Sequence, residues 1–541
     1  MSFITKLNRF ASNKVNMNMK RSKFNLSHGT KTTFKSGVIV PLLVDEVLPD
    51  DTIKLDVASV VRSITPAVPV MDNAYLDVFA FWVPARLCTV HEKDFQKVFG
   101  ENTAGFWAPS SESTLENTGN TFTIGSANAV QVQSIGNYFG LPIGFYHSTM
   151  KLSRLPFNGY FEIWNEWFRD QNVQSPIDWK SYSATQLAAA LNSPLKANKF
   201  HDYFTSALPS PQKGASVLLP MGGQAPVKTS ATELVTGAQQ AMKIRNTSGN
   251  TFSGQLGGVA GSFNYSSTSI SSTGAAYPTN LYADLAAATA ASVNDLRQAF
   301  AIQKLLEKDA RGGTRYREML MSHFGVSIPD NTVQVPEYLG GKRIPLNMLQ
   351  VLQTSETGTN PLGSTGAFSN TADSSHLFVK SFAEFGYIYV LGVIRPNQSY
   401  SQGISKMFTR NRRYDFYHPV FANLGEQAVK TTELYANSSS NVDTVFGYQE
   451  AWAEYRYKPT KLTGYVAANS GDLVAQSWTY GQKFSAAPVL NSTFIQQDET
   501  QIDNTLVIQS GSYQFIGDFF FSYYAWRAMP YFSIPGLIDH H

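Results

Sequence analysis

Residues 381–394 read Ser381-Phe-Ala-Glu-Phe-Gly-Tyr-Ile-Tyr-Val-Leu-Gly-Val-Ile394 and end in an uninterrupted apolar run of eight residues. β-Branched and aromatic side chains dominate this run, which is typical of a buried β-strand. A membrane-spanning helix needs about eighteen apolar residues or more. The run therefore predicts a strand in the protein core, and we expect no membrane span.

Similar runs lie towards both ends of the chain. They are Val38-Ile-Val40, Thr52 to Val57, Tyr75 to Val83, Ala451 to Tyr457 and Tyr513 to Tyr524. Prolines between the N-terminal runs predict turns or edge positions, at Pro41, Pro49, Pro66, Pro69 and Pro84. Because a long stretch with few βαβ alternations separates the two groups, we expect a mainly β fold. An antiparallel sandwich or barrel with long loops is favoured over a doubly wound fold.

Two segments predict helices. The first runs from Phe157 to Asp170, and the second is the Ala-rich segment from Leu281 to Arg311, with Gly312-Gly313 as its stop. An apolar stripe is expected along the second helix, formed by Leu281, Leu285, Val293, Leu296 and Phe300.

The segment between these helices has an unusual composition. From Asn246 to Asn280, 23 of 35 residues are Gly, Ser, Thr or Asn, and no charged residue occurs between Arg245 and Asp284. A disordered linker has such a composition. Apolar residues nevertheless recur through the segment, as in a small β-rich excursion: Phe252, Leu256, Val259, Phe263, Tyr265, Ile270 and Tyr277. We interpret the segment as an inserted protruding loop region.

The overall composition is that of a globular protein with little charge. The chain has 541 residues, of which 43% are hydrophobic, 13% aromatic and 15% charged. So low a charge suggests surfaces that contact other subunits. Cys88 is the only cysteine, which excludes an internal disulfide and a cysteine-based metal site, and we expect a buried, inert thiol. The N-terminus has no secretion signal, so we expect synthesis in the cytoplasm.

Charge is distributed unevenly, although its net value is +3. Residues 1–44 contain eight basic and no acidic residues: Lys6, Arg9, Lys14, Lys20, Arg21, Lys23, Lys31 and Lys35. The remaining 35 of the 43 basic residues share the rest of the chain with all 40 acidic residues, so the body carries a formal charge of −5. A basic arm on an acidic body is the arrangement expected when the arm meets a polyanion.

The spacing of the basic residues in the arm is typical of nucleic-acid binding. Its basic residues alternate with Ser, Asn and occasional Phe, which favours sequence-independent phosphate contacts and some base stacking. The predicted nucleic-acid-binding residues are Lys6, Arg9, Lys14, Lys20, Arg21 and Lys23. From composition alone, a solvated tail that binds nothing is an equal alternative. For a second basic cluster, we expect ion pairs with neighbouring acids: Lys406, Arg410, Arg412 and Arg413.

Motifs for catalysis or metal binding are weak. Gly341-Lys342 lacks the upstream glycine and the following Ser or Thr of a phosphate-binding loop. His91-Glu92 begins like a zinc-protease helix, but Phe95 stands where the second histidine would be needed. Glu162 and Glu166 lie four residues apart, as acids do on many helical surfaces. We therefore predict no enzyme, no catalytic residue, no metal site and no cofactor.

A series of phrases follows in order along most of the chain. They are Pro66-Ala-Val-Pro-Val-Met-Asp-Asn73, Leu155-Pro-Phe157, Ile163 to Asn172, His201 to Gly214, Leu296 to Phe300, Asp309 to Tyr316, Pro336 to Gly341, Asn423 to Gln427, Val445 to Trp452 and Pro535 to Asp539. Together they resemble the major capsid protein of the gokushovirus group of Microviridae, small bacteriophages with single-stranded DNA. The Leu87-Cys-Thr89 stretch is less aromatic than that family leads us to expect.

The resemblance implies a viral jelly roll, an eight-stranded antiparallel β-barrel with long loops. It implies self-assembly into an icosahedral T=1 shell around a circular single-stranded DNA genome. In that family a large insertion projects at the threefold axes and is thought to meet the host. We therefore divide the chain into a basic arm (1–44), the first part of the jelly roll (45–220), the protruding insertion (221–280) and a helix with the remainder (281–541). Candidate host-contact residues are Phe252, Phe263, Tyr265 and Tyr277.

The implied partners are other copies of the chain, single-stranded DNA, a receptor on the bacterial host surface and other virion proteins. The latter include a small DNA-binding protein and a pilot or minor protein, with a scaffold protein as a further partner during assembly. The implied location is the virion, with assembly in the host cytoplasm. The residues alone leave open a carbohydrate-binding or carbohydrate-active β-sandwich, because jelly rolls often hold sugars against Trp and Tyr. The acidic body argues against a stand-alone single-strand DNA-binding protein.

Overall fold

The structure, a computed structural model, describes residues 20–91, 94–98, 114–116, 118–215, 217, 293–355, 362–363, 365–437, 443–507 and 513–532, and short strands between residues 227 and 283. The chain divides into two compact units, one formed by Met1–Pro211 with Gly312–His541 and the other by Gln212–Arg311. The described residues form several antiparallel sheets, which confirms a mainly β fold. None of the described helices is long and apolar enough to cross a membrane.

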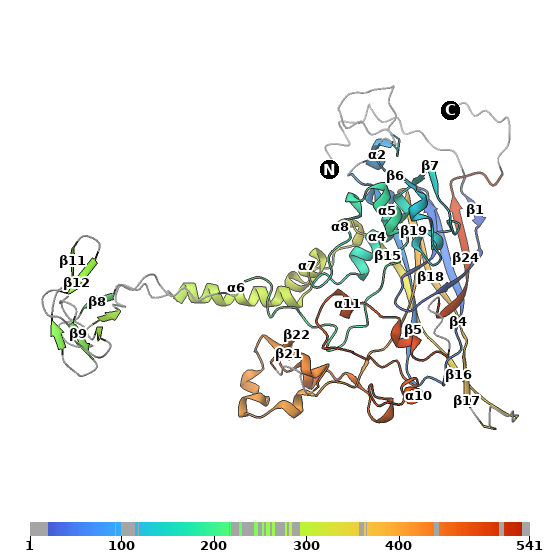
Figure 1. Cartoon of the computed structure of the whole chain (residues 1–541). Coiled ribbons are helices and arrows are strands. Elements are labelled where there is room, and N and C mark those ends of the chain that lie inside the picture. The colour runs from blue at the N-terminus through green and yellow to red at the C-terminus, as the bar shows by residue number, and fades with distance from the viewer. Residues whose placement is uncertain are drawn as a thin grey trace, which may run out of the picture. The chain divides into compact units, whose positions relative to one another are not determined.

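Two large sheets form the framework of the first unit (Figure 1). In the first sheet, β1 and β2 both pair with β24, which is followed by β4 and β18. In the second sheet, the order is β15, β5, β19, β3. The bounds are β1 Ser22–Asn25, β2 His28–Phe34, β3 Val40–Val47, β4 Thr52–Ser63, β5 Ala74–Pro84, β15 Glu337–Pro345, β18 Thr371–Ser381, β19 Gly386–Pro396 and β24 Phe515–Arg527.

The strands pair from the two ends of the chain inward. β2 pairs with β24, β3 with β19, β4 with β18 and β5 with β15, and all four pairs are antiparallel. This is the pairing of one long hairpin. Two further antiparallel pairs, β24 with β4 and β19 with β5, join the hairpin pairs into sheets.

The main core lies between the two sheets. Buried and exposed residues alternate along β4 and β24, so one face of the first sheet points inward. Phe515, Phe519 and Phe521 of β24 belong to one buried cluster with Leu76 of β5 and Val390 of β19. The other face of the first sheet is left open.

The strand predicted from the apolar run is β19, which is buried on both faces. Ile388 and Val390 pack between the sheets, whereas Tyr389 and Leu391 belong to a second cluster on the opposite face. A strand covered on both faces needs apolar residues at nearly every position. This explains why the run is continuous and does not alternate with polar residues.

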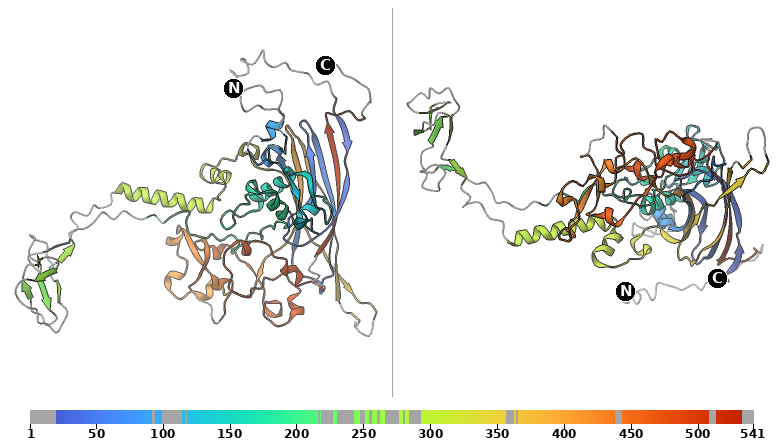
Figure 2. Two further views of the ribbon diagram at one scale, coloured as in Figure 1. Left: turned by 45° about the horizontal axis from the view of Figure 1, so that its top comes forward. Right: turned by 90° about the horizontal axis from the view of Figure 1, so that it is seen from below.

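Helices cover the outer face of the second sheet (Figure 2). The helix predicted over 157–170 is found as α4 (Leu155–Ile163), continued by a π-helical turn (Trp164–Phe168). Tyr389 Oη donates a hydrogen bond to Pro156 O at 2.7 Å, which ties β19 to the start of α4. The other α-helices of this unit are α2 Asp94–Val98, α3 Ile135–Tyr138, α5 Ala184–Ala190, α7 Tyr316–Phe324, α8 Asp330–Val333, α9 Ala453–Arg456, α10 Leu473–Gln476, α11 Ser492–Ile495 and α12 Thr500–Asp503.

Between β19 and β24 the chain forms short elements around a smaller cluster. Phe204, Tyr400, Leu434, Phe446 and Phe494 are buried in it. β20 (Ser399–Tyr400) pairs in parallel with β23 (Thr460–Lys461), and β21 (Glu426–Lys430) pairs with β22 (Val445–Glu450). Two more antiparallel pairs lie elsewhere in the unit, β6 (Thr121–Ile124) with β7 (His147–Ser153) and β16 (Met348–Leu352) with β17 (Thr365–Ser369).

The second unit contains small sheets and one long helix, α6 (Val293–Arg311). β9 (Lys243–Asn246) pairs with β10 (Thr251–Ser253) and β13 (Ala276–Pro278), β11 (Leu256–Val259) with β12 (Ser262–Tyr265), and β8 (Val227–Thr229) with β14 (Leu281–Ala283). At the base of the unit, Lys213 N donates a hydrogen bond to Leu306 O at 3.3 Å. The chain therefore enters and leaves the unit side by side.

Two local expectations need correction. Ala451 to Tyr457 is not a strand but contains the helical turn α9, because Trp452 takes a left-handed conformation (φ 67°) that ends the preceding strand. The second helix begins only at Val293, since Leu281–Ala283 pairs with β8 instead. Phe300 of the expected apolar stripe is exposed. Pairing with distant segments outweighs local helix propensity here.

The structure also places most of the predicted basic arm in the framework. From Ser22 onward, residues of the 1–44 range form β1, β2 and the start of β3. What remains of the proposed arm is the stretch before β1, and residues 1–19 lie outside the described part.

Candidate nucleic-acid interface and contact surfaces

Arg21, one of the predicted nucleic-acid contacts, is held at the start of β1. It donates hydrogen bonds to Thr52 Oγ1 at 2.6 Å, to Trp526 O at 3.2 Å and to Asp50 O. Its Nε lies 3.5 Å from the Asp50 carboxylate. These bonds fix β1 against β4 and β24, so the Arg21 guanidinium has a structural role.

Lys23 lies on an aromatic surface of the paired strand. Its Nζ is 4.2 Å from the centre of the Tyr524 ring and 5.4 Å from that of Trp526. The pairing of Lys23 with Trp526 in the β1–β24 register sets this geometry. An exposed lysine above aromatic rings combines a cation with stacking surfaces, as single-strand binding sites do.

The other basic residues of this region differ in their surroundings. Lys20 is exposed, and Lys6, Arg9 and Lys14 lie outside the described residues. Lys31 and Lys35 form ion pairs with Asp518 at 3.3 Å and Glu499 at 3.1 Å. Of the predicted contacts that the structure describes, Lys20 and Lys23 are therefore the ones whose charge is not taken up by an ion pair.

The open face of the first sheet is largely apolar, and the carboxylates of its hollow are paired with lysines. A shallow hollow of about 800 Å³ lies on it, with Val60 and Phe520 among its lining residues. The charged lining residues are Lys31, Asp373 and Asp518. Asp518 pairs with Lys31 and Asp373 pairs with Lys342, so the hollow offers no unpaired positive charge to a phosphate backbone. This hollow therefore suits contact with protein better than contact with DNA.

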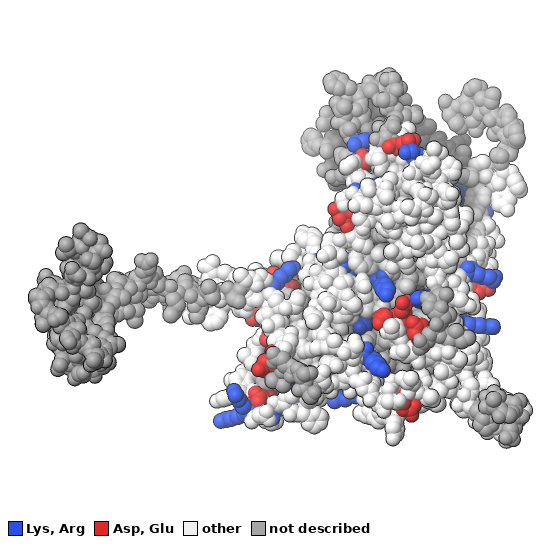
Figure 3. Space-filling model, viewed as in Figure 1, with Lys and Arg blue, Asp and Glu red and all other residues white. Residues whose placement is uncertain are grey.

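A second exposed apolar region is the segment 404–424, which we call the apolar segment. Its large exposed side chains are Ile404, Met407, Phe408, Tyr414, Phe416, Tyr417, Val420 and Leu424. Val420 is 88% exposed. On the face of the molecule in Figure 3, charged residues are few and scattered. Exposed aromatic residues together with Met and Arg are typical of protein interfaces.

The sequence analysis missed the apolar segment as a surface. Its aromatic residues alternate with the basic cluster, and the sequence was interpreted there by its charge alone. Arg410 of that cluster forms the expected ion pair, with Nη2 2.7 Å from Glu454 Oε1. The density of Tyr and Phe between residues 408 and 421 was the available signal.

The candidate host-contact residues lie on strands of the second unit. Phe252 is in β10, Phe263 and Tyr265 are in β12, and Tyr277 is in β13. β10 and β13 both pair with β9, so Phe252 and Tyr277 share one small sheet. Phe263 and Tyr265 belong to a separate hairpin with β11.

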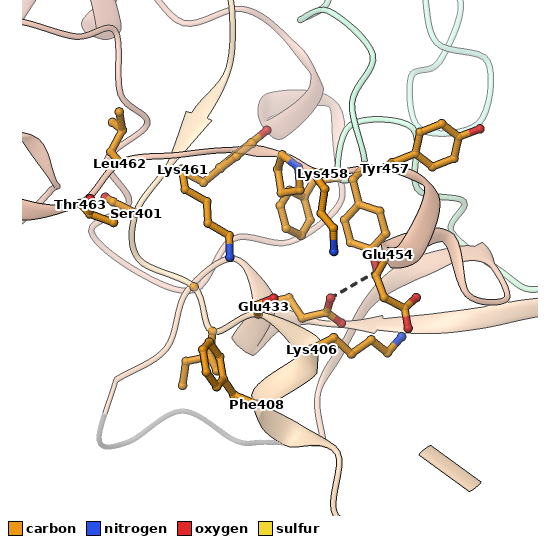
Figure 4. Close-up of a pocket in the computed structure, with 17 residues that line it drawn as sticks. Ser401, Lys406, Phe408, Glu433, Glu454, Tyr457, Lys458, Lys461, Leu462 and Thr463 are labelled. Carbon is orange, nitrogen blue, oxygen red and sulfur yellow. Dashed lines mark hydrogen bonds between the residues drawn. The ribbon is translucent and has the colours of Figure 1, made fainter. Parts of the chain in front are cut away.

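A pocket of about 280 Å³ lies next to the apolar segment (Figure 4). On one side Tyr203 Oη donates a hydrogen bond to Glu433 Oε2 at 3.3 Å. Burial raises the pKa of Glu433, although the nearby Lys406 ammonium acts in the opposite direction. The ring of Phe204 lies 5.0 Å from those of Tyr203 and Tyr400 and completes an aromatic wall.

The residues considered for catalysis have structural surroundings. Cys88 is completely buried, and burial raises the pKa of its thiol, so the reactive thiolate is disfavoured. Glu162 accepts a hydrogen bond from Trp179 Nε1 at 2.8 Å, and Glu166 Oε2 lies 3.9 Å from Arg315 Nε. Lys342 pairs with Asp373 at 2.8 Å. Within the described ranges, no cluster of three or more His, Cys, Asp or Glu residues could hold a metal ion.

These features define a structural β-protein with large exposed aromatic and aliphatic surfaces. The chain belongs to the capsid protein (F protein) family, whose sequence profile matches residues 13–537. This confirms the resemblance to capsid proteins of Microviridae bacteriophages. Membership of the family makes the protein a structural component of the virion and not an enzyme.

Three relatives match over nearly their whole length, and each is described as capsid protein VP1. The chain is 39% identical to the protein of Bdellovibrio phage phiMH2K over 524 residues, with 95% of each chain covered. It is 35% identical to that of Spiroplasma virus 4, with 96% of this chain and 95% of the relative covered. It is 34% identical to that of Chlamydia phage 1, with 96% of each covered.

Proposed function

We propose that this chain is the major capsid protein of an icosahedral T=1 shell around a circular single-stranded DNA genome, and that its two large sheets form a viral jelly roll. The observation that carries the proposal is the order of strand pairing. The strands pair in the order expected when one long hairpin is rolled into a barrel. The pairs are β2 with β24, β3 with β19, β4 with β18 and β5 with β15. Membership of a capsid family supports the same fold and sets aside the carbohydrate-binding alternative.

The apolar surfaces support assembly from many copies. The apolar segment and the open face of the first sheet expose aromatic and aliphatic residues. Burying these residues between subunits would lower the free energy of the assembly. Low charge limits repulsion between neighbouring subunits. Modest contacts repeated by symmetry close a shell cooperatively without any single tight interface.

Shell formation is tested by expressing the full chain together with the neighbouring phage genes and imaging the high-mass fraction by electron microscopy. We expect uniform, closed icosahedral particles built mainly from this chain. Discrete small species without shells, even with helper proteins present, would overturn the proposal. Val420→Asp should prevent closure while leaving the melting temperature of the chain unchanged, and the nearly isosteric Val420→Thr is its matched control.

The proposed DNA contact is the basic stretch before and within β1. Lys20 and Lys23 make no ion pair among the described residues, and three further basic residues precede them in the sequence. Each phosphate contact to a single strand contributes about 0.7 to the slope of log K against log salt. Replacing Lys6, Arg9, Lys14, Lys20 and Lys23 by Gln should lower the DNA content of particles and flatten this slope.

Arg21 is retained in this variant, because it fixes β1 to the sheet. The matched control exchanges Lys for Arg and Arg for Lys at the same five positions, which keeps every charge. Unchanged DNA content and salt dependence in the Gln variant would remove the arm from the proposal, while leaving the shell itself untouched.

We propose further that the second unit carries the surface that meets the bacterial host. Its 246–280 segment has no charged residue, 23 of its 35 residues are Gly, Ser, Thr or Asn, and its described parts are short strands. Such a segment tolerates variation without loss of the main core. Deleting residues 246–280 should leave particles intact and DNA-filled but abolish adsorption to host cells. Retained adsorption would contradict this role.

The remaining partners are those that the resemblance to gokushovirus capsid proteins implies. We propose that the virion also holds a small DNA-binding protein and a pilot or minor protein, and that a scaffold protein acts during assembly in the host cytoplasm. Mass spectrometry of purified virions and of assembly intermediates would identify them. Virions that contain this chain as their sole protein would contradict the proposed composition.

A further inference from the structure

The pocket beside the apolar segment has no part in the functions proposed above. We call it the lysine pocket and define it by Tyr203, Tyr400, Glu433, Lys458 and Lys461. Its volume of about 280 Å³ lies near the lower end of small-molecule sites, which span about 300–1,000 Å³. The pocket therefore fits one compact ligand.

Each of the two carboxylates of the pocket has a cation nearby, and Glu454 forms an ion pair with its cation. Glu454 pairs with Arg410, and both side chains are largely buried. Glu433 faces Lys406, whose Nζ also donates a hydrogen bond to Ala428 O at 3.3 Å. Burial raises the pKa of Glu433, while the Lys406 ammonium acts in the opposite direction.

Two lysines of the pocket have no acidic partner among the described residues. Lys458 and Lys461 are exposed, and in Figure 4 both side chains point into the pocket. Neither forms an ion pair within the described part of the chain. The backbone of Lys461 is fixed, because β23 pairs with β20 and Leu462 N donates to Tyr400 O at 3.0 Å. Two neighbouring ammonium groups without counter-ions attract an anion, and phosphate suits lysine well.

Aromatic rings complete the site. Phe408 and Tyr457 line the pocket with 70% and 57% of their surface exposed, so their rings are accessible from solvent. Nucleic-acid bases stack on such rings, and this stacking favours binding of any base. Unpaired ammonium groups next to accessible rings are the combination that recognises a phosphate joined to an aromatic base.

We propose that the lysine pocket binds a nucleotide, with its phosphate on Lys458 and Lys461 and its base on the ring of Phe408 or Tyr457. The nucleotide is either free or one unit of a single DNA strand, since both offer the same groups. The site lies within a single chain, and Phe408 also belongs to the apolar segment that the shell proposal places between subunits, so binding is tested on the unassembled chain.

The test is calorimetric titration of the full-length chain with dAMP, with deoxyadenosine and with inorganic phosphate at constant ionic strength. We expect dAMP to bind at least tenfold more tightly than deoxyadenosine or inorganic phosphate. Absence of dAMP binding up to millimolar concentration, or equal binding of phosphate alone, would overturn the proposal.

Variants locate the site. Lys458→Met with Lys461→Met should weaken dAMP binding at least tenfold, and Phe408→Ala together with Tyr457→Ala should remove its advantage over phosphate. All four residues are exposed, so the fold should persist, which an unchanged melting temperature would verify. Lys430→Met is the matched control, since Lys430 is an exposed lysine paired with Asp443 outside the pocket. Loss of binding in the control, or normal binding in the double lysine variant, would reject the assignment.

A short oligothymidylate separates the two sources. If it competes with dAMP in the wild type, and if its own binding, measured by calorimetry, falls in the lysine variant, the pocket takes a unit of the DNA strand. If dAMP binds and the oligonucleotide does not compete, the ligand is a free nucleotide. Both results support the site, whereas oligonucleotide binding that is undiminished in the lysine variant would place the DNA contact elsewhere and contradict the strand form.

Discussion

Gly159 lies in α4 where this helix packs closely on β19. A Cβ atom at this position would overlap the Tyr389 hydroxyl, which is held by its hydrogen bond to Pro156 O. Gly159→Ala should therefore lower the free energy of unfolding by about 1–3 kcal/mol, the usual cost of overpacking a core. Urea denaturation of the full chain measures this. Gly125→Ala is the control, because a Cβ there meets no atom within 4 Å. Equal effects of the two changes would contradict the close contact.

Glu162 gives the protein a dependence of stability on pH. Burial raises its pKa above the ordinary value of 4.5, mainly by desolvation, although the Trp179 hydrogen bond acts in the opposite direction. Its contribution to stability is therefore fully present below about pH 4.5 and is lost as the pH rises through the folded-state pKa. Glu162→Gln should remove this loss, so the variant gains stability relative to the wild type as the pH increases from 4 to 8.

Urea denaturation of wild type and variant across that pH range measures the difference in their free energies of unfolding. For one titrating group, this difference changes by at most about 1.4 kcal/mol per pH unit. Glu116→Gln changes a carboxylate that is 60% exposed and serves as the control. A constant difference between wild type and Glu162→Gln at all pH values would refute the argument.

At the scale of elements, β1 is a short edge strand that depends on a few contacts. It is held by its pairing with β24 and by the hydrogen bonds of Arg21. Deleting residues 2–19 should leave the free energy of unfolding unchanged, whereas deleting residues 2–27 should lower it by about 2 kcal/mol, since several hydrogen bonds of about 0.5–1.5 kcal/mol are lost. Chemical denaturation of both truncated chains decides this. Equal stability of the two would show that β1 adds nothing to the sheet.

At the scale of the whole molecule, the chain enters and leaves the second unit at one place. The contact between Lys213 N and Leu306 O brings the two connecting segments together. Replacing residues 216–303 by a short Gly-Ser linker should therefore change the free energy of unfolding of the first unit by no more than about 0.5 kcal/mol. Thermal and urea unfolding of the shortened chain test this. A loss of several kcal/mol would mean that the first unit needs the second to fold.

The sequence by itself determined the class of the fold and the family. The continuous apolar run of β19 and the aromatic-rich run of β24 identify strands, because β-branched and aromatic residues favour strands. The ordered phrases identified the capsid family, and the uneven charge marked the basic N-terminal stretch. These signals are local, so they survive without knowledge of any contact.

Only the tertiary structure decided which distant residues meet. Pairing of β2 with β24 joins segments near opposite ends of the chain, and no local pattern encodes that choice. Arg21 was expected at DNA but is used to hold β1, because Thr52 and Trp526 O lie within its reach. The same holds for the lysine pocket, whose residues come from separate stretches between 203 and 463. Contacts of this kind depend on strand register and chain crossing, which arise only when the whole chain packs.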